Sequence, residues 1–261
     1  MGIGSGYGNE AVGRTGMAGQ STDLAGLKRF AKTLLQLDIQ KTKMSPLVVK
    51  HPFTDSGIVG IQTPDGHLGI ANLVESKKDL QTWRKQTAET IDQAESPYQV
   101  FMLITKPYML GFLKYAQPYL SNEDFTQMLA DAWVRSESPN DDPNLSKKKL
   151  LALFKAADPT ILMDEEERGM LRDLESPVTV YRGVTSYNAK NVKVLSWTLD
   201  ENVAQWFAQR YGEQGTVYQA QIHKDHIYAI FTGRNESEVI VDPKHLVNIE
   251  PVQDLTMDLK M

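Results

Sequence analysis

The sequence pattern changes at Pro177 from helical to β, and this change constrains the fold more than any other feature. Over residues 121–174, directly before Pro177, apolar side chains recur at the spacing of helices that bury one face. After it, apolar and β-branched runs alternate with turns, and one helix is expected at 201–211. The runs predict strands at 178–184, 192–198, 216–223, 227–232, 238–242 and 246–250. Helices in one part of a chain and strands in another are typical of α+β proteins, so we predict that class.

Helix-capping residues stand at the start of most of the expected helices. Serine, threonine and aspartate side chains accept hydrogen bonds from the first unpaired backbone N–H groups of a helix. The expected starts are Thr22 or Asp23, Ser76, Ser121, Ser146 and the acidic cluster 164–167. The apolar segment 98–117 contains Pro107 and Gly111, which predicts either a broken buried helix or a strand followed by a helix.

Three regions are predicted along the chain. Residues 1–22 are rich in glycine and lack apolar periodicity, so we expect a flexible tail. Residues 23–95 are expected to form a small α+β region, in which Thr63-Pro64-Asp65-Gly66 is the turn of a β-hairpin. Residues 96–254 are expected to form the second folded region.

Composition excludes several kinds of site. The chain of 261 residues has no cysteine, which rules out disulfides, thiolate metal sites and a cysteine nucleophile. Its five histidines are scattered, and we predict no metal site. A net charge of −5 argues against direct nucleic-acid binding by the whole chain. No apolar run approaches the roughly 20 residues of a membrane span, so we expect no membrane partner and a cytoplasmic location.

Arg182 is the first candidate functional residue. In the expected strand 178–184 it shares a face with Val178 and Val180. A charged group on an apolar face must reach the rim or meet a partner, because an unpaired buried charge is costly. The guanidinium fork matches phosphate oxygens, so a pyrophosphate is one such partner. A structural carboxylate is the alternative.

Ser196 and Thr198 stand two residues apart in an expected strand, so their hydroxyls share a face and Trp197 lies on the other. Asp200 follows them and is placed to cap the expected helix 201–211. A Ser-x-Thr pair alone often only satisfies neighbouring backbone groups. A strand with Ser-x-Thr followed directly by a capped helix is a more specific signal of a functional site than the Ser-x-Thr pair alone.

Glu236 and Glu238 are also two apart, directly before the apolar run Val239-Ile240-Val241. On one face of a strand, two such carboxylates would lie roughly 7 Å apart. That separation suits contacts with two parts of one substrate. The alternative is a solvated turn ahead of a buried strand.

Taken in order, these three signals resemble the signature of the Arg–Ser–Glu class of mono-ADP-ribosyltransferases, a family that includes bacterial toxins and phage-encoded enzymes. Arg182, Ser196 and Glu238 match the three signature positions, and Glu236 matches the first glutamate of the family's Glu-x-Glu form. The resemblance covers about residues 121–250. One position departs from it, since Trp197 replaces the central threonine of the usual Ser-Thr-Ser motif.

The resemblance implies a split β-sandwich preceded by helices, with NAD as the substrate. Arg182 would hold the phosphates, and Gly183 would let the backbone approach the nicotinamide amide. Glu238 would stabilise the ribosyl cation, with Ser196 orienting it and Thr198 supporting both. Glu236 would position the acceptor.

The function implied is that of a toxin-like effector enzyme of the glycosyltransferase class. It would move ADP-ribose from NAD to a protein acceptor, with arginine favoured, and release nicotinamide. Its location would be its own cytoplasm or that of a target cell. Two alternatives remain open: an NAD glycohydrolase, and a non-enzymatic particle-associated protein that retains the fold, which Trp197 favours.

Overall fold

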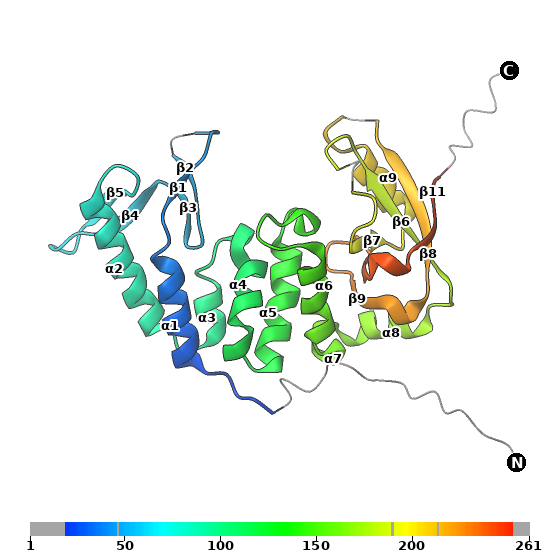
Figure 1. Ribbon diagram of the computed structural model, residues 1–261, viewed down its shortest axis with the longest axis horizontal. Coiled ribbons are helices and arrows are strands. Elements are labelled where there is room, and N and C mark those ends of the chain that lie inside the picture. The colour runs from blue at the N-terminus through cyan, green and yellow to red at the C-terminus, as the bar shows by residue number, and fades with distance from the viewer. Residues whose placement is uncertain (1–18, 46, 189–190, 213, 253–261) are drawn as a thin grey trace, which may run out of the picture.

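The computed structural model describes residues 19–45, 47–188, 191–212 and 214–252 of the chain. Most of the expected tail, residues 1–18, therefore lies outside the described residues. The described part is elongated, with small β-hairpins at one end, helices in the middle and the largest sheet at the other end (Figure 1).

Small antiparallel sheets and two helices form the N-terminal region. The elements are α1 (Leu24–Leu35), β1 (Gln40–Lys41), β2 (Val48–His51), β3 (Thr54–Ser56), β4 (Ile58–Gln62), β5 (Leu68–Asn72) and α2 (Lys77–Gln93). The predicted hairpin is confirmed, because β4 pairs with β5 in a register that runs from Ile58 opposite Asn72 to Gln62 opposite Leu68.

A run of helices forms the middle of the molecule. They are α3 (Pro97–Phe101), α4 (Met109–Ala116), α5 (Asn122–Arg135), α6 (Lys147–Ala156), α7 (Pro159–Leu162) and α8 (Glu165–Asp173). The segment 98–117 is a broken helix, because the 3-10 turn Lys106–Tyr108, which contains Pro107, separates α3 from α4. The alternative of a strand in this segment is wrong.

The predicted helix caps are confirmed. Asp23, Ser76, Ser121 and Ser146 each accept a hydrogen bond from a backbone N–H in the first turn of their helix. Asp164 forms a capping box in which the Glu167 side chain returns the bond. These local contacts set where the helices begin.

A six-stranded antiparallel sheet forms the C-terminal region, as the α+β prediction required. Its strands are β6 (Val178–Val184), β7 (Ser196–Thr198), β8 (Thr216–Ile222), β9 (Ile227–Phe231), β10 (Glu238–Val241) and β11 (Val247–Pro251), in the order β11-β8-β6-β7-β10-β9. A single residue pair, Tyr181 with Thr198, joins β6 to β7. The sheet therefore consists of two three-stranded halves with a narrow junction.

The strand expected over 192–198 is shorter than predicted, and only Ser196–Thr198 belongs to the sheet. The backbone N–H groups of Leu195 and Ser196 instead donate to the side-chain oxygen of Asn140, at 3.1 and 3.2 Å. A side chain from another part of the chain replaces the strand partner there. The apolar run in the sequence extends further than the strand because Val194 and Leu195 are buried in an irregular segment before it.

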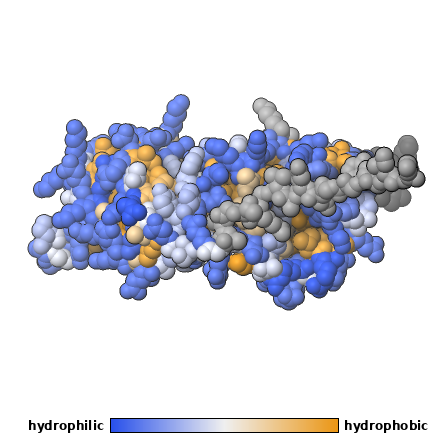
Figure 2. Space-filling model, turned by 60° about the horizontal axis from the view of Figure 1, so that its bottom comes forward, coloured by the Kyte–Doolittle hydropathy of each residue, from blue (hydrophilic) through white to orange (hydrophobic). Residues whose placement is uncertain are grey.

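Helix α9 (Glu201–Ala208) covers the junction by packing on β6. Gly183 makes this contact possible, since a Cβ there would lie 2.1 Å from the backbone oxygen of Ala204 and 2.5 Å from the nitrogen of Ala208. One connected hydrophobic core runs from Leu27 in α1 to Leu246 next to β11, across the expected boundary at residue 95. The space-filling view shows a mostly hydrophilic face with small apolar areas (Figure 2).

Among the described residues, no helix has both the length and the apolar character that crossing a bilayer demands.

Candidate functional site

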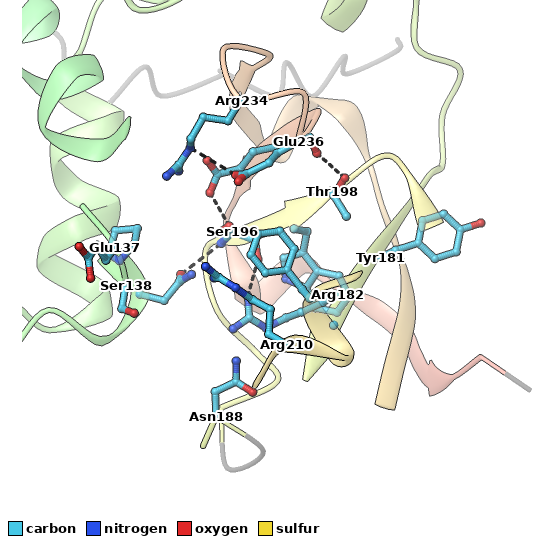
Figure 3. A pocket seen from close by; sticks show the side chains of 16 residues that line it. Glu137, Ser138, Tyr181, Arg182, Asn188, Ser196, Thr198, Arg210, Arg234 and Glu236 are labelled. Carbon is cyan, nitrogen blue, oxygen red and sulfur yellow. Dashed lines mark hydrogen bonds and ion pairs between the residues drawn. The ribbon is translucent and has the colours of Figure 1, made fainter. Parts of the chain in front are cut away.

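A pocket with a volume of about 310 Å³ lies at the junction between β6, β7 and β10 (Figure 3). All the site residues predicted from the sequence line it: Arg182, Gly183, Ser196, Thr198, Glu236 and Glu238. Trp197 also lines it, and residues that the sequence did not single out complete the lining: Glu137, Ser138, Pro139, Asn140, Tyr181, Asn188, Phe207, Arg210 and Arg234. Three motifs that are distant in sequence therefore share one cavity.

The Ser196 hydroxyl donates a short hydrogen bond to Oε1 of Glu238. Ser196 is on β7 and Glu238 begins β10, and these strands pair with Glu238 opposite Thr198 and Ile240 opposite Ser196. The register brings the hydroxyl and the carboxylate together although 42 residues separate them. The hydrogen bond therefore fixes the position of the Glu238 carboxyl group relative to β7.

Glu238 is a buried carboxyl group, with 7% of its surface exposed. Burial raises its pKa above the usual 4.5, because the charged form loses its hydration. The hydrogen bond from Ser196 and the nearby indole of Trp133 act in the opposite direction, although the Trp133 nitrogen lies outside ordinary hydrogen-bond geometry. A carboxylate held this way, in a place poor in water, interacts strongly with a positive charge that enters the pocket.

The Arg182 guanidinium lies beside this pair. Its Nη1 donates to the backbone oxygen of Ser196 at 2.8 Å, which links β6 to β7 where the two strands share only one residue pair. Arg182 is partly buried and faces the pocket. It thus links the two strands and places a positive charge at the pocket.

Glu236 does not lie on a strand, and the expectation of two carboxylates on one strand face is wrong. β10 begins at Glu238, and Glu236 belongs to the loop that follows β9. Positive φ angles at Asn235 (55°) and Ser237 (41°) turn the chain there, which breaks the alternation of a strand. Thr198 fixes the loop by donating from Oγ1 to the backbone oxygen of Glu236 at 2.6 Å.

The other two members of the motifs have packing roles. Gly183 lines the pocket, and its missing side chain makes room for α9. Trp197 is 2% exposed and belongs to the hydrophobic core, with its indole N–H donating to Val194 O at 3.1 Å. The tryptophan in the middle of the Ser-x-Thr motif therefore leaves the two hydroxyls in place.

Two further arginines line the pocket. Arg210 lies over the rings of Trp206 and Phe207, at 4.9 and 5.2 Å from the ring centres. Arg234 lies in the loop before β10, with Nε 3.5 Å from Oε2 of Glu236. With Arg182, these side chains give the pocket three guanidinium groups beside its three glutamates, Glu137, Glu236 and Glu238, a set suited to a ligand that carries both phosphate and positive charge.

Asn140 and Trp133 are the residues that sequence reasoning missed most clearly. Asn140 fixes the start of β7 from a loop 55 and 56 residues away, and Trp133 acts on Glu238 from α5. Neither has a local pattern that predicts its place. The only available signal was the polar loop Ser138-Pro139-Asn140, which is too common to assign a role.

Among the described residues, no group of three or more histidine, aspartate or glutamate side chains is arranged to hold a metal ion. Comparisons with protein-family models, with curated proteins and with solved structures find no significant match. The function is therefore inferred from the residues of this pocket.

Proposed function

We propose that the pocket belongs to an enzyme that transfers a glycosyl group from NAD. The observation that carries the proposal is the linked set of Arg182, Ser196 and Glu238, joined by two hydrogen bonds across 14 and 42 residues of sequence. NAD has an anionic pyrophosphate and a positively charged nicotinamide ring attached to a ribose, and the pocket offers guanidinium groups and a buried carboxyl group.

The particular activity that we propose is mono-ADP-ribosylation of a protein, with arginine as the acceptor. The resemblance of the three motifs to the Arg–Ser–Glu class supports this choice. The two three-stranded halves of the sheet, with helices ahead of them in the chain, are also consistent with the split β-sandwich of that class. Glu236 at the pocket supports an arginine acceptor, because a carboxylate binds a guanidinium well.

Each residue has a role in the proposed reaction. The bond between nicotinamide and ribose breaks through an oxocarbenium-like state, as in glycoside cleavage. Glu238, held by Ser196, stabilises the positive charge that develops on the ribose. Arg182 binds the phosphates, and Arg210 is placed to assist it. Glu236 orients the acceptor guanidinium and takes up the proton that it loses.

The test is to measure released nicotinamide and protein-bound label in parallel, with labelled NAD and a cell lysate as the source of acceptors. Glu238→Gln should lower nicotinamide release at least a hundredfold, which is about 2.7 kcal/mol of transition-state stabilisation, with little change in NAD affinity. Glutamine keeps the shape and removes the charge. An unchanged rate in the folded variant would reject the catalytic role.

Glu236→Gln separates transfer from hydrolysis in the same assay. It should abolish protein labelling and spare slow nicotinamide release, because water needs no carboxylate to hold a guanidinium. Free ADP-ribose without labelled protein from the unaltered chain would instead identify a glycohydrolase. Failure to bind NAD at millimolar concentration would support the non-enzymatic alternative.

A further inference from the structure

Glu236 already has a guanidinium beside it. Nε of Arg234 lies 3.5 Å from Oε2 of Glu236, and both side chains line the pocket. The close-up view shows the two side chains pointing toward each other from the loop between β9 and β10 (Figure 3). The side chain of Arg234 is 42% exposed and that of Glu236 is 24% exposed.

The ion pair is not needed to build the loop. Backbone contacts already hold it: Asn235 N donates to Thr232 O at 2.8 Å, and Leu199 N donates to Ser237 O at 3.1 Å. The Thr198 hydroxyl adds a third contact at Glu236 O. A partly exposed ion pair contributes only about 0–1 kcal/mol to stability. Loop stability therefore does not account for an arginine at this position.

The other pocket arginines have different surroundings. Arg182 donates to the backbone of β7, and Arg210 lies over two aromatic rings. Arg234 is the pocket arginine that is ion-paired to Glu236, and its charge also acts on the buried Glu238. Its contact with Glu236 is through Nε. Neither terminal nitrogen of Arg234, where an arginine accepts a glycosyl group, makes a hydrogen bond with another described residue.

We propose that Arg234 is a modification site at which the protein ADP-ribosylates itself within one chain. The proposal rests on the proposed function of the same pocket. The bond from the ribose anomeric carbon to nicotinamide breaks, and its electron pair leaves with neutral nicotinamide. A terminal nitrogen of Arg234 bonds to that carbon, and the guanidinium proton passes to Glu236 and then to solvent.

Modification at Arg234 should lower the turnover of the enzyme with external acceptors. The attached ADP-ribose is bulky and anionic, and it lies where an external acceptor must approach Glu236. Modification at Arg234 therefore blocks later transfer, and the enzyme limits its own activity. Preincubation with NAD should lower the rate of transfer to agmatine, a small guanidine acceptor, by at least tenfold.

The test is to incubate the purified full chain with NAD, then record its intact mass and map its peptides. We expect the mass of one ADP-ribosyl group on the peptide that contains Arg234. The rate of modification should be independent of protein concentration, because the acceptor and the site share a chain. A rate that rises in proportion to concentration would contradict modification within one chain.

Arg234→Lys keeps the positive charge beside Glu236 and removes the guanidinium, so self-modification should be lost. Arg135→Lys is the matched control, because Arg135 also forms a partly exposed ion pair, at 2.8 Å with Asp131, on α5. That variant should be modified as the unaltered chain is. Undiminished labelling of Arg234→Lys would overturn the inference.

The outcomes also separate this inference from the proposed function. Nicotinamide release and agmatine labelling without modified Arg234 in the unaltered chain would reject the inference and leave the function standing. Absence of both nicotinamide release and any label would reject the two together.

Discussion

At the scale of single residues, the site is organised around a carboxyl group that is costly to keep charged. Glu238 is 7% exposed, and burial raises its pKa. A hydroxyl and an indole act against that rise, from β7 and α5 respectively. The ionised form is the one that can stabilise a cation, so under the proposed function these neighbours would set the pH range of activity.

The first residue-scale prediction concerns Trp133. The acid limb of nicotinamide release should lie above pH 4.5, because activity is lost as the pH falls through the raised pKa of Glu238. Trp133→Phe removes an indole that lowers this pKa, so the acid limb should move to higher pH. The measurement is the rate against pH for both proteins. A limb that stays in place or moves to lower pH would show that the indole does not act on Glu238.

The second residue-scale prediction concerns Thr198. Its hydroxyl donates to Glu236 O at 2.6 Å and accepts from Asp200 N at 3.0 Å, so it connects the loop to the start of α9. Thr198→Val should lower transfer to protein more than nicotinamide release, at least tenfold in the ratio, because Glu236 loses its position. Thr198→Ser keeps the hydroxyl and serves as the control. Equal losses in both rates would assign Thr198 to the NAD site instead.

The sequence predicted the residues of the pocket better than their geometry. Arg182, Ser196 and Glu238 were selected because each is a polar residue in or beside an apolar strand and because the three motifs in order resemble a family signature. The place of Glu236 was predicted wrongly, because alternation was extended into a turn with positive φ at Asn235 and Ser237. Asn140 was missed because its contact with β7 spans 55 residues.

At the scale of elements, the contact between α9 and β6 brings Phe207 and Gly183 together in the lining of the pocket. A Cβ at Gly183 would lie within 2.5 Å of backbone atoms of α9, and one at Gly215 would lie 2.2 Å from the backbone oxygen of Val184 in β6 and 2.4 Å from that of Ala208 in α9. Backbone atoms cannot rotate away as a side chain can, so the helix as a whole would have to shift. The close approach explains why glycine is needed at both positions.

The element-scale prediction follows from Gly183. Gly183→Ala should destabilise the protein by about 1–3 kcal/mol or more, since it forces a shift of packed backbone. Gly233→Ala is the matched control, because a Cβ at Gly233 meets nothing within 4 Å. Urea unfolding of the two variants measures the difference. Equal stability of Gly183→Ala and the unaltered chain would show that α9 yields easily.

Elements with a local cause were predicted well, and those with a distant cause were not. The helix starts at Ser76, Ser121 and Ser146 follow from capping by adjacent residues, and all were confirmed. The expected strand 192–198 was too long because Asn140, far away in the sequence, takes the backbone N–H groups at its start. Apolar pattern alone does not distinguish a strand from a buried irregular segment.

At the scale of the whole molecule, one core connects the N-terminal strands to the sheet that carries the pocket. His51, at the end of β2, contacts both the N-terminal helix α2 and the segment that leads into the middle helices. Its ring is 5.4 Å from that of Trp83 on α2, and its backbone oxygen accepts from the hydroxyl of Thr105, which precedes α4. We therefore expect the N-terminal region and the C-terminal sheet to unfold together as one cooperative unit. A substitution at His51 tests this coupling.

The whole-molecule prediction is a loss of stability in mild acid. Burial, assisted by the nearby charge of Arg84, lowers the pKa of His51 from 6.5 to about 4. Between these two pKa values the unfolded chain binds a proton at His51 and the folded chain does not. The contribution of neutral His51 to the free energy of unfolding is therefore complete above pH 6.5 and is lost as the pH falls toward 4. Between pH 7 and pH 5 the loss is about 2 kcal/mol.

The variant His51→Asn isolates the pH-dependent contribution of His51 to the free energy of unfolding. Nδ1 of His51 accepts from Phe53 N at 3.1 Å, and the asparagine side-chain oxygen can accept the same bond without titrating. The difference in unfolding free energy between pH 7 and pH 5 should therefore be about 2 kcal/mol smaller in the variant. Other titrating groups, Glu238 and Asp242 among them, are common to both proteins and cancel in the comparison.

Tryptophan fluorescence reports the transition at Trp83 near His51 and at Trp197 beside the pocket. If the pocket end keeps its midpoint while the His51 end shifts, the two ends unfold separately and the continuous core does not couple them.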